Sequence, residues 1–233
     1  MTIRGLLFDK DGTLFDFDAT WTRWAGDALR ELGDGDESRT QAMADALGYD
    51  LEKARFHPGS SVIAGTVGEQ AEALSPFLPE MDVLAITGRI NALAARVVQV
   101  EVLPLRPFLE TWKERDVALG VATNDAESSA RAHLTSVDAL DAFDFLAGYD
   151  SGHGFKPGPG QLLAFADATG LEPASIAMVG DSTHDLMAAR AAGMVAVAVL
   201  TGPADADTLA PYADVVLSSI ADLPGWVATS SGR

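Results

Sequence analysis

Apolar runs that alternate with helical segments constrain the fold of this chain most. The runs Val117–Ala122, Ile176–Val179 and Val195–Leu200 are apolar throughout, and a similar run at 3–8 is broken only by Arg4 and Gly5. Such runs are typical of parallel strands buried on both faces, and parallel neighbours need crossover connections. We therefore expect an α/β fold with a doubly wound, mostly parallel, Rossmann-like sheet.

Helical spacing fills the intervals between these runs. It covers residues 126–134, 159–169 and 185–192, with Asn124 or Asp125 available to cap the first of these helices and with Gly170 and Gly193 able to end the other two. Further short strands are expected at 143–147 and 214–217.

Two carboxylates stand where the first apolar run ends. Asp9 and Asp11 follow Phe8, and Gly12 then permits a sharp turn. Ligand sites in open α/β sheets lie at the carboxyl ends of the strands. Side chains two apart on an extended chain share a face, so the two acids converge and favour a cation or a proton between them. An acidic turn without a function is the simpler alternative for these residues taken alone.

Three later motifs favour a functional interpretation. They are Thr123-Asn124-Asp125 after an apolar run, Lys156-Pro157-Gly158-Pro159 after a glycine-rich loop, and Asp181-Ser182-Thr183-His184-Asp185 after another apolar run. Taken singly, Asp181 is explained by a helix cap, Asp185 by a favourable charge in a first helical turn, and Lys156 by an exposed loop. Their order and their positions after strands make the combination more specific than any member.

At these residues the chain resembles the haloacid dehalogenase-like (HAD) hydrolase superfamily. Its four ordered motifs are matched by Asp9 with Asp11, by Thr123, by Lys156, and by Asp181 with Asp185. The sequences Asp-Gly-Thr-Leu and Lys-Pro-Gly-Pro are most similar to those of phosphoglycolate phosphatase-like members. The resemblance implies a catalytic α/β core formed by residues 1–15 and 104–233, with residues 16–103 inserted as a smaller helical cap.

The resemblance also implies a role for each motif position. Asp9 would attack phosphorus to give an aspartyl-phosphate, while Asp11 would protonate the leaving alkoxide and later activate water. Thr123, Asn124 and Lys156 would bind the substrate phosphate, with Lys156 offsetting its charge. The expected catalytic residues are therefore Asp9, Asp11, Thr123 and Lys156, and the expected substrate is a small phosphorylated metabolite of the phosphoglycolate type.

The carboxylates further predict a Mg²⁺ site, since hard oxygen ligands select Mg²⁺ over softer metals. By resemblance, the ligands would be the Asp9 and Asp181 carboxylates and the Asp11 backbone carbonyl. Asp185 would either bind the ion itself or orient a residue that does. His184 is expected to be a solvated residue at a helix start, because imidazole is a poor Mg²⁺ ligand.

Helical spacing also predominates between residues 16 and 103. One helix would be capped by Asp18 or Thr20 and end at Gly33, and others are expected over 38–47, 68–74 and 91–102. His57 and Arg89 are candidates for substrate contact from this region, against the simpler interpretations of a structural histidine and a solvated arginine. Related phosphatases often carry Asp-Ser where this chain has Asp16-Phe17, a departure that bears on substrate contacts.

Composition limits the partners. Sixteen Lys and Arg face 34 Asp and Glu, a formal charge of −18, so the averaged field repels nucleic acid and anionic membranes. The absence of cysteine excludes thiol nucleophiles and thiolate metal sites. With no signal pattern at residues 1–4 and no run of membrane-spanning length, we expect a cytoplasmic monomer or homodimer whose partner is a small molecule.

Two alternatives remain open. A phosphosugar mutase of the β-phosphoglucomutase type would share Asp9 and Asp11, but its cap would have to protect a phosphorylated intermediate from water. A non-catalytic member would use the fold to bind a partner, although every reacting position is filled here. A dehalogenase is disfavoured because that activity needs no metal cluster.

Overall fold

A six-stranded parallel sheet forms the centre of one half of the molecule. The structure is a computed structural model that describes residues 2–57 and 60–230. The strand order is β5-β4-β1-β6-β7-β8, and every neighbouring pair is parallel. The strands are β1 (Gly5–Phe8), β4 (Ala118–Ala122), β5 (Phe145–Ala147), β6 (Ile176–Gly180), β7 (Val195–Val199) and β8 (Val215–Leu217). The expectation of a doubly wound α/β fold is confirmed.

Alternation along β1 separates the core into two layers, one on each face of the sheet. Leu6 and Phe8 belong to a cluster with Trp112, whereas Leu7 lies on the opposite face with Phe165. The first layer is covered by α6 (Leu105–Lys113), α7 (Glu127–Ser136) and α11 (Leu223–Ser230). The second is covered by α8 (Gly160–Thr169), α9 (Thr183–Ala192) and α10 (Ala206–Leu209). Burial on both faces explains why the strands are apolar throughout.

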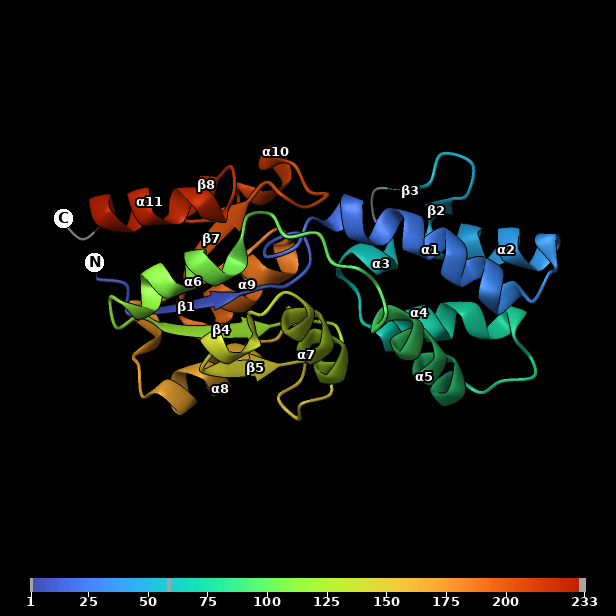
Figure 1. The fold of residues 1–233 in the computed structure, drawn as a ribbon, viewed down its shortest axis with the longest axis horizontal. Helices are drawn as coiled ribbons and strands as arrows, with labels where there is room; N and C mark the ends of the chain where they lie inside the picture. Colours follow the sequence, from blue (N-terminus) through green and yellow to red (C-terminus); the bar gives the residue numbers. More distant parts are fainter. Residues whose placement is uncertain (1, 58–59, 231–233) are drawn as a thin grey trace.

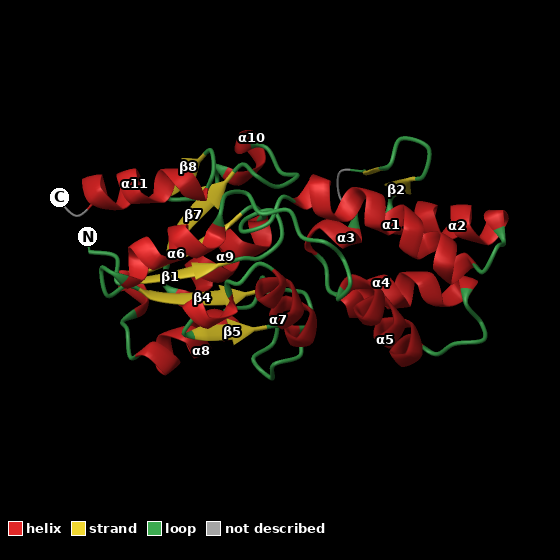
Figure 2. Ribbon diagram, viewed as in Figure 1, coloured by secondary structure: helices red, strands yellow, loops and turns green. Residues whose placement is uncertain are grey.

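A second group of helices lies beyond the carboxyl ends of the strands, at the right of Figures 1 and 2. It consists of α1 (Phe17–Gly33), α2 (Glu37–Leu47), α3 (Ser61–Ala64), α4 (Val67–Leu74) and α5 (Val83–Ala94), with a hairpin of β2 (Tyr49–Asp50) and β3 (Arg55–Phe56). These elements share their own hydrophobic cluster, which includes Leu29, Met43 and Ile86. None of the helices in the described part of the chain combines the length and the apolarity that crossing a bilayer requires.

Four short 3₁₀ turns complete the described elements: Ser75–Phe77, Leu140–Ala142, Pro173–Ser175 and Ile220–Asp222. Most expected helices differ from the observed ones by only a few residues at their ends, and Gly48, Gly170 and Gly193 end α2, α8 and α9 in the left-handed conformation.

The expected helix over 91–102 is wrong. Helix α5 ends at Ala94, and the chain then returns toward the sheet beside the segment that leaves it. The Asp16 amide donates to the Val100 carbonyl at 2.8 Å, and the Val102 amide donates to the Leu14 carbonyl at 3.0 Å. These bonds to a distant segment replace the local bonds of a helix, which is why helical spacing alone misled.

Two expected caps are also wrong. Asp16, not Asp18 or Thr20, caps α1 by accepting from the Ala19 amide at 2.9 Å. Helix α7 begins after Ala126, and Asp150, not Asn124 or Asp125, accepts from the amide of its first residue, Glu127, at 2.9 Å. The β2–β3 hairpin was not expected, since its strands have only two residues each.

The packing of β4 predicts the effect of one added methyl group. A Cβ on Gly120 would lie 2.8 Å from the Phe165 ring and 2.9 Å from Leu7 Cδ1. We expect Gly120→Ala to lower the free energy of unfolding by about 1–3 kcal/mol through overpacking. Urea denaturation measures this change. The matched control is Gly88→Ala in α5, where a Cβ meets nothing within 4 Å, and there we expect a gain of up to about 1 kcal/mol. Equal effects at the two positions would contradict the packing.

Candidate active site

Three buried carboxylates meet at the carboxyl edge of the sheet. Asp9 follows β1 and Asp181 follows β6, and these strands are adjacent and parallel, so their ends coincide. Asp185 lies in the first turn of α9. Each of the three offers an oxygen, and these oxygens all lie within 4.8 Å of one another. The sequence motifs at 9, 181 and 185 are thus brought together.

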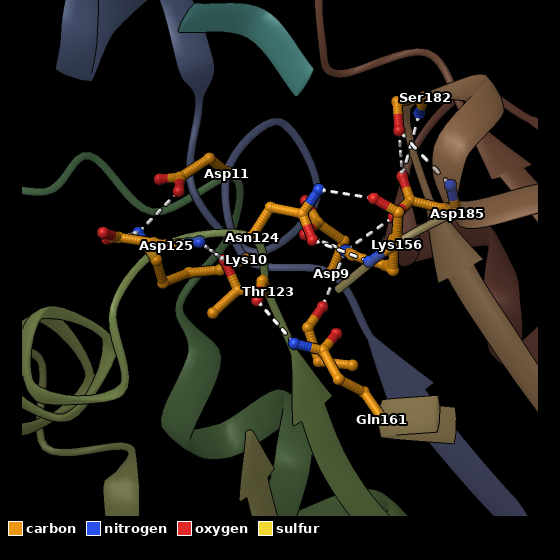
Figure 3. A network of polar contacts seen from close by, with 11 residues as sticks. Asp9, Lys10, Asp11, Thr123, Asn124, Asp125, Lys156, Gln161, Ser182 and Asp185 are labelled. Atoms are coloured by element: carbon orange, nitrogen blue, oxygen red, sulfur yellow. Dashed lines mark hydrogen bonds and ion pairs between the residues drawn. The ribbon is translucent and has the colours of Figure 1, made fainter. Parts of the chain in front are cut away.

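Lys156 reaches the same place from the loop before α8. Its Nζ lies 2.6 Å from an oxygen of Asp9 and 2.6 Å from an oxygen of Asp185, and it donates to the Ala122 carbonyl at 2.7 Å. Figure 3 shows this ammonium between the two carboxylates. The Lys156 side chain is 3% exposed, so these contacts are shielded from solvent screening.

Asn124 fixes the backbone of Lys156 rather than capping a helix. Its Nδ2 donates to the Lys156 carbonyl at 2.9 Å, and its Oδ1 accepts from the Lys156 amide at 2.9 Å. Thr123 is buried beside it, and its hydroxyl oxygen accepts from the Asp125 amide at 3.0 Å. The Thr123 carbonyl accepts from Gln161 Nε2 at 2.9 Å, which ties this turn to α8. The motif at 123–125 and the motif at 156 therefore support each other.

The electrostatics of this cluster show an excess of negative charge. Burial, together with the nearby charges of Asp185 and Asp11, raises the pKa of Asp9 to about 7 despite the opposing effect of Lys156. Burial, followed by Asp9 and Asp185, also raises the pKa of Asp181 well above its usual value. Burial alone would lower the pKa of Lys156, but Asp185 and Asp9 raise it above its usual value. One lysine thus faces three carboxylates that need more positive charge than it supplies.

Asp11 points away from this cluster toward a second buried lysine. Asp11 Oδ2 lies 2.6 Å from Lys10 Nζ, and Asp11 Oδ1 accepts from Trp21 Nε1 of α1 at 2.7 Å. Lys10 also lies 3.3 Å from Asp125 Oδ2 and 5.3 Å from the centre of the Trp21 ring. Burial would lower the pKa of Lys10, but Asp11 and Asp125 raise it. The orientation of the Asp11 carboxyl is therefore set from two sides.

His133 completes this second array from α7. Its Nδ1 lies 3.1 Å from Lys10 Nζ, and its Nε2 lies 2.9 Å from the Ala94 carbonyl. An ammonium only donates and a carbonyl only accepts, so the ring carries its proton on Nε2. Burial and Lys10 together lower the pKa of His133 to about 4. The neutral ring joins Lys10 to the end of α5.

Sequence reasoning missed Lys10, Asp125, His133 and Trp21 as parts of the site. One signal was available for Lys10: it follows a buried strand almost directly, and a buried lysine needs a partner of opposite charge. Nothing in the sequence indicates that His133 contacts Lys10 or that Trp21 contacts Asp11, because these contacts join positions far apart in the chain.

A pocket opens above both arrays, and its two sides differ in character. On the sheet side it is lined by the charged residues Asp9, Asp11, Asp125, Lys156, Asp181 and Asp185, with Thr123, Asn124, Ser182 and the half-buried His184. Facing them, α1 contributes Phe17, Trp21 and Trp24. The later helices and their connection contribute Val62, Ile63, Gly65, Val67, Gln70, Ile90 and Ala94.

The two candidates for substrate contact at 57 and 89 lie away from this pocket. His57 is exposed and is not among the lining residues. Arg89 is exposed, and its Nη2 lies 3.4 Å from Glu31. The simpler interpretation of each residue agrees with its position. Phe17, which stands where the sequence resemblance often implies a serine, does line the pocket.

The Lys10 array generates a stability prediction. Replacing Lys10 with methionine leaves Asp11 and the buried Asp125 without their cation, so we expect a loss of about 3–5 kcal/mol in the free energy of unfolding. Urea denaturation measures the loss. Adding Asp125→Asn removes one of the uncompensated charges and should recover part of it. The control is Lys53→Met, whose pair with Asp50 is at the surface and should change stability by less than about 1 kcal/mol. A loss that small for Lys10→Met would contradict the assignment.

Comparisons with known proteins agree with this geometry. Residues 3–193 match the family described as haloacid dehalogenase-like hydrolase. The chain is 31% identical to a phosphoglycolate phosphatase of Chromobacterium violaceum over 95% of each chain, and 28% identical to hexitol phosphatase B of Escherichia coli K12 over 95% of this chain and 94% of the other. The structure of a HAD phosphatase from Thermococcus onnurineus shares the fold, with a TM-score of 0.67, 22% identity, and coverage of 97% and 98% of the two chains. This chain belongs to the haloacid dehalogenase-like hydrolase family.

Proposed function

We propose that this chain is a Mg²⁺-dependent phosphatase that hydrolyses a small phosphorylated metabolite through an aspartyl-phosphate. The observation that carries the proposal is the meeting of Asp9, Asp181 and Asp185 around Lys156 at the edge of the sheet. The names of both curated relatives support a phosphatase. In this proposal residues 1–15 and 104–233 are the catalytic core, and residues 16–103 are a cap over it.

Asp9 is the proposed nucleophile. One of its oxygens accepts from Lys156 Nζ, which holds the carboxyl in a defined orientation. Attack forms an oxygen–phosphorus bond as the bond from phosphorus to the substrate alcohol breaks. Lys156 lies close enough to offset the charge that the transferring group brings. Thr123 and Asn124, which line the pocket next to Lys156, are the other proposed phosphate contacts.

Asp11 is the proposed acid and base. It would give a proton to the departing alkoxide and then take one from the water that releases phosphate from Asp9. Both of its oxygens face donors, Lys10 on one side and Trp21 on the other. Such contacts restrict rotation of the Asp11 carboxyl, so that it faces the same point when it gives a proton to the alkoxide and when it takes one from water.

The donor set fits Mg²⁺. Asp9 and Asp181 supply hard carboxylate oxygens in a cluster where burial and neighbouring carboxylates raise the pKa of both groups. Glycine at 12 and 202 leaves room around Asp181, since a Cβ at either position would collide with its carboxylate. When bound, the ion would neutralise charge on the transferring phosphoryl group. The Asp11 backbone carbonyl is the third proposed ligand from the protein.

The contacts of Asp185 favour an orienting role over direct metal binding. Its Oδ1 accepts from Lys156, and its Oδ2 accepts from the Ser182 amide at 3.0 Å and the Ser182 hydroxyl at 2.7 Å. Both oxygens are thus already used. In the proposal Asp185 holds Lys156 and the turn at 182, and Asp181 binds the ion.

The nucleophile can be tested by substitution. Asp9→Asn keeps the size of the side chain but removes its nucleophilic charge, so we expect Mg²⁺-dependent release of phosphate from p-nitrophenyl phosphate to fall by at least about 10³-fold. A phosphate assay with wild type and variant measures this. Circular dichroism should show the variant folded. No release of phosphate by the wild type would overturn the phosphatase proposal. Conversion of a phosphosugar to its isomer without free phosphate would favour the mutase instead.

Metal binding can be tested without activity. Mg²⁺ at 100 times its dissociation constant stabilises the folded state by about 2.7 kcal/mol, which for a chain of this size raises Tm by about 5–10 °C. We expect this shift for the wild type and its loss in Asp181→Asn, measured by scanning calorimetry. Asp214→Asn, whose pair with Arg190 is far from the site at the surface, should retain the shift. A shift that persists in Asp181→Asn would exclude Asp181 as a ligand.

A further inference from the structure

The side of the pocket that faces the carboxylates is almost entirely apolar. Phe17 and Trp21 are 2% and 7% exposed, and Val67 and Ile90 are each 6% exposed, so this wall is packed and shaped before any ligand binds. In a phosphatase the phosphate occupies the charged side, and the alcohol part of the substrate meets the other. The side chains of this wall therefore indicate what kind of alcohol the substrate contains.

The wall has no cation to offer a second anionic group. Among the described residues that line the pocket, Lys156 is the only lysine or arginine, and Asp9 and Asp185 already bind it. Lys10 is fully buried behind Asp11 and pairs with it. A substrate with a carboxylate or a second phosphate would lose its hydration without gaining a charged partner, which is strongly unfavourable.

The wall is equally poor in groups that bind hydroxyls. The indole N–H of Trp21 is taken by Asp11, and that of Trp24 donates to the Leu93 carbonyl at 3.2 Å. The two rings therefore present carbon surface, and they pack edge to face with centres 4.9 Å apart. Gln70 is the polar side chain that the described helices α1, α3, α4 and α5 contribute to the lining. A sugar with several hydroxyls would find one partner here.

A second, smaller cavity lies next to the apolar wall, inside the helical group. Trp24, Val62, Gln70 and Ile90 line both the active-site pocket and this cavity. Beyond them the cavity is lined by side chains such as Leu29, Leu32 and Leu74. The apolar wall is therefore backed by further apolar side chains, with no charged residue among the described residues that line this second cavity.

We infer that the physiological substrate is the phosphate monoester of an apolar alcohol, aliphatic or aromatic, with no second anionic group. This inference rests on the proposed phosphatase function and changes its expected substrate: the phosphoglycolate type implied by the sequence resemblance becomes a poor fit. The apolar part lies against Trp21, Trp24 and Ile63.

A series of alkyl phosphates tests the inference. Ethyl, butyl and hexyl phosphate have leaving alkoxides of nearly equal basicity, so differences in kcat/KM report contacts with the chain rather than leaving-group chemistry. We expect kcat/KM to rise by about two- to fourfold for each added methylene that enters the pocket. Hexyl phosphate should also be hydrolysed more efficiently than glycerol 3-phosphate, glucose 6-phosphate or 2-phosphoglycolate, as judged by the same constant.

A pair of variants tests the same wall. Ile63→Arg supplies the missing cation. We expect it to raise the ratio of kcat/KM for 2-phosphoglycolate to kcat/KM for hexyl phosphate by at least about tenfold relative to the wild type. Ile63→Leu keeps the wall apolar and should leave that ratio within about twofold of the wild type.

The outcomes separate this inference from the function on which it rests. A flat alkyl series, or a preference of the wild type for 2-phosphoglycolate or a sugar phosphate, overturns the apolar substrate and leaves the phosphatase standing. Failure to release phosphate from every compound overturns both. A rising series with weak activity on the anionic and sugar phosphates supports both.

Discussion

The ammonium of Lys156 between two buried carboxylates is the interaction on which the site depends. Asp9, Asp181 and Asp185 are each under 9% exposed, and like charges so close are compatible with folding only when positive charge lies among them. Lys156 satisfies two of them and is itself held by Asn124, so the loop before α8 is tied to β1 and α9 at once. The balance remains negative, which gives the edge of the sheet its affinity for a divalent cation in the proposed function.

Asp9 and Asp11 each pair with a different lysine. Lys10 lies in a bend between the two acids, and its ammonium contacts Asp11, Asp125 and His133. Lys156 serves the nucleophile, and Lys10 serves the proposed acid. One cation per carboxyl lets the two acids differ in environment although they are two residues apart, which is what different chemical roles require.

The sheet and the four motifs could be predicted from the sequence because both depend on short-range signals. Apolar runs identify strands buried on both faces, and each motif stands directly after a strand or before a helix. The apolar alternation at 3–8 even separates the two core layers, since Leu6 and Leu7 belong to different faces. Family resemblance supplied the roles of the motif residues, which the residues alone left open.

The contacts between distant segments could not be predicted. The segment 95–102 has helical spacing, yet it does not continue the helix, because the backbone at 100–102 bonds to 14–16, and no local sequence pattern indicates that pairing. Asp125 is a residue type that often caps helices, but here it pairs with Lys10. Trp21 has the spacing of an ordinary core residue of α1, but its indole N–H donates to Asp11. Tertiary partners override local preference at each of these positions.

The paired segments 14–16 and 100–102 have a mechanical consequence. Two unpaired segments would let the helical group rotate freely relative to the sheet. Hydrogen bonds between the two segments make them one short connection that resists twisting. Helix α1 begins at the end of this connection and carries Trp21, so any swing of the helices away from the sheet withdraws the indole from Asp11. In the proposed function, the orientation of the acid is thereby coupled to the position of the helices above it, because one of the two contacts that hold Asp11 comes from α1.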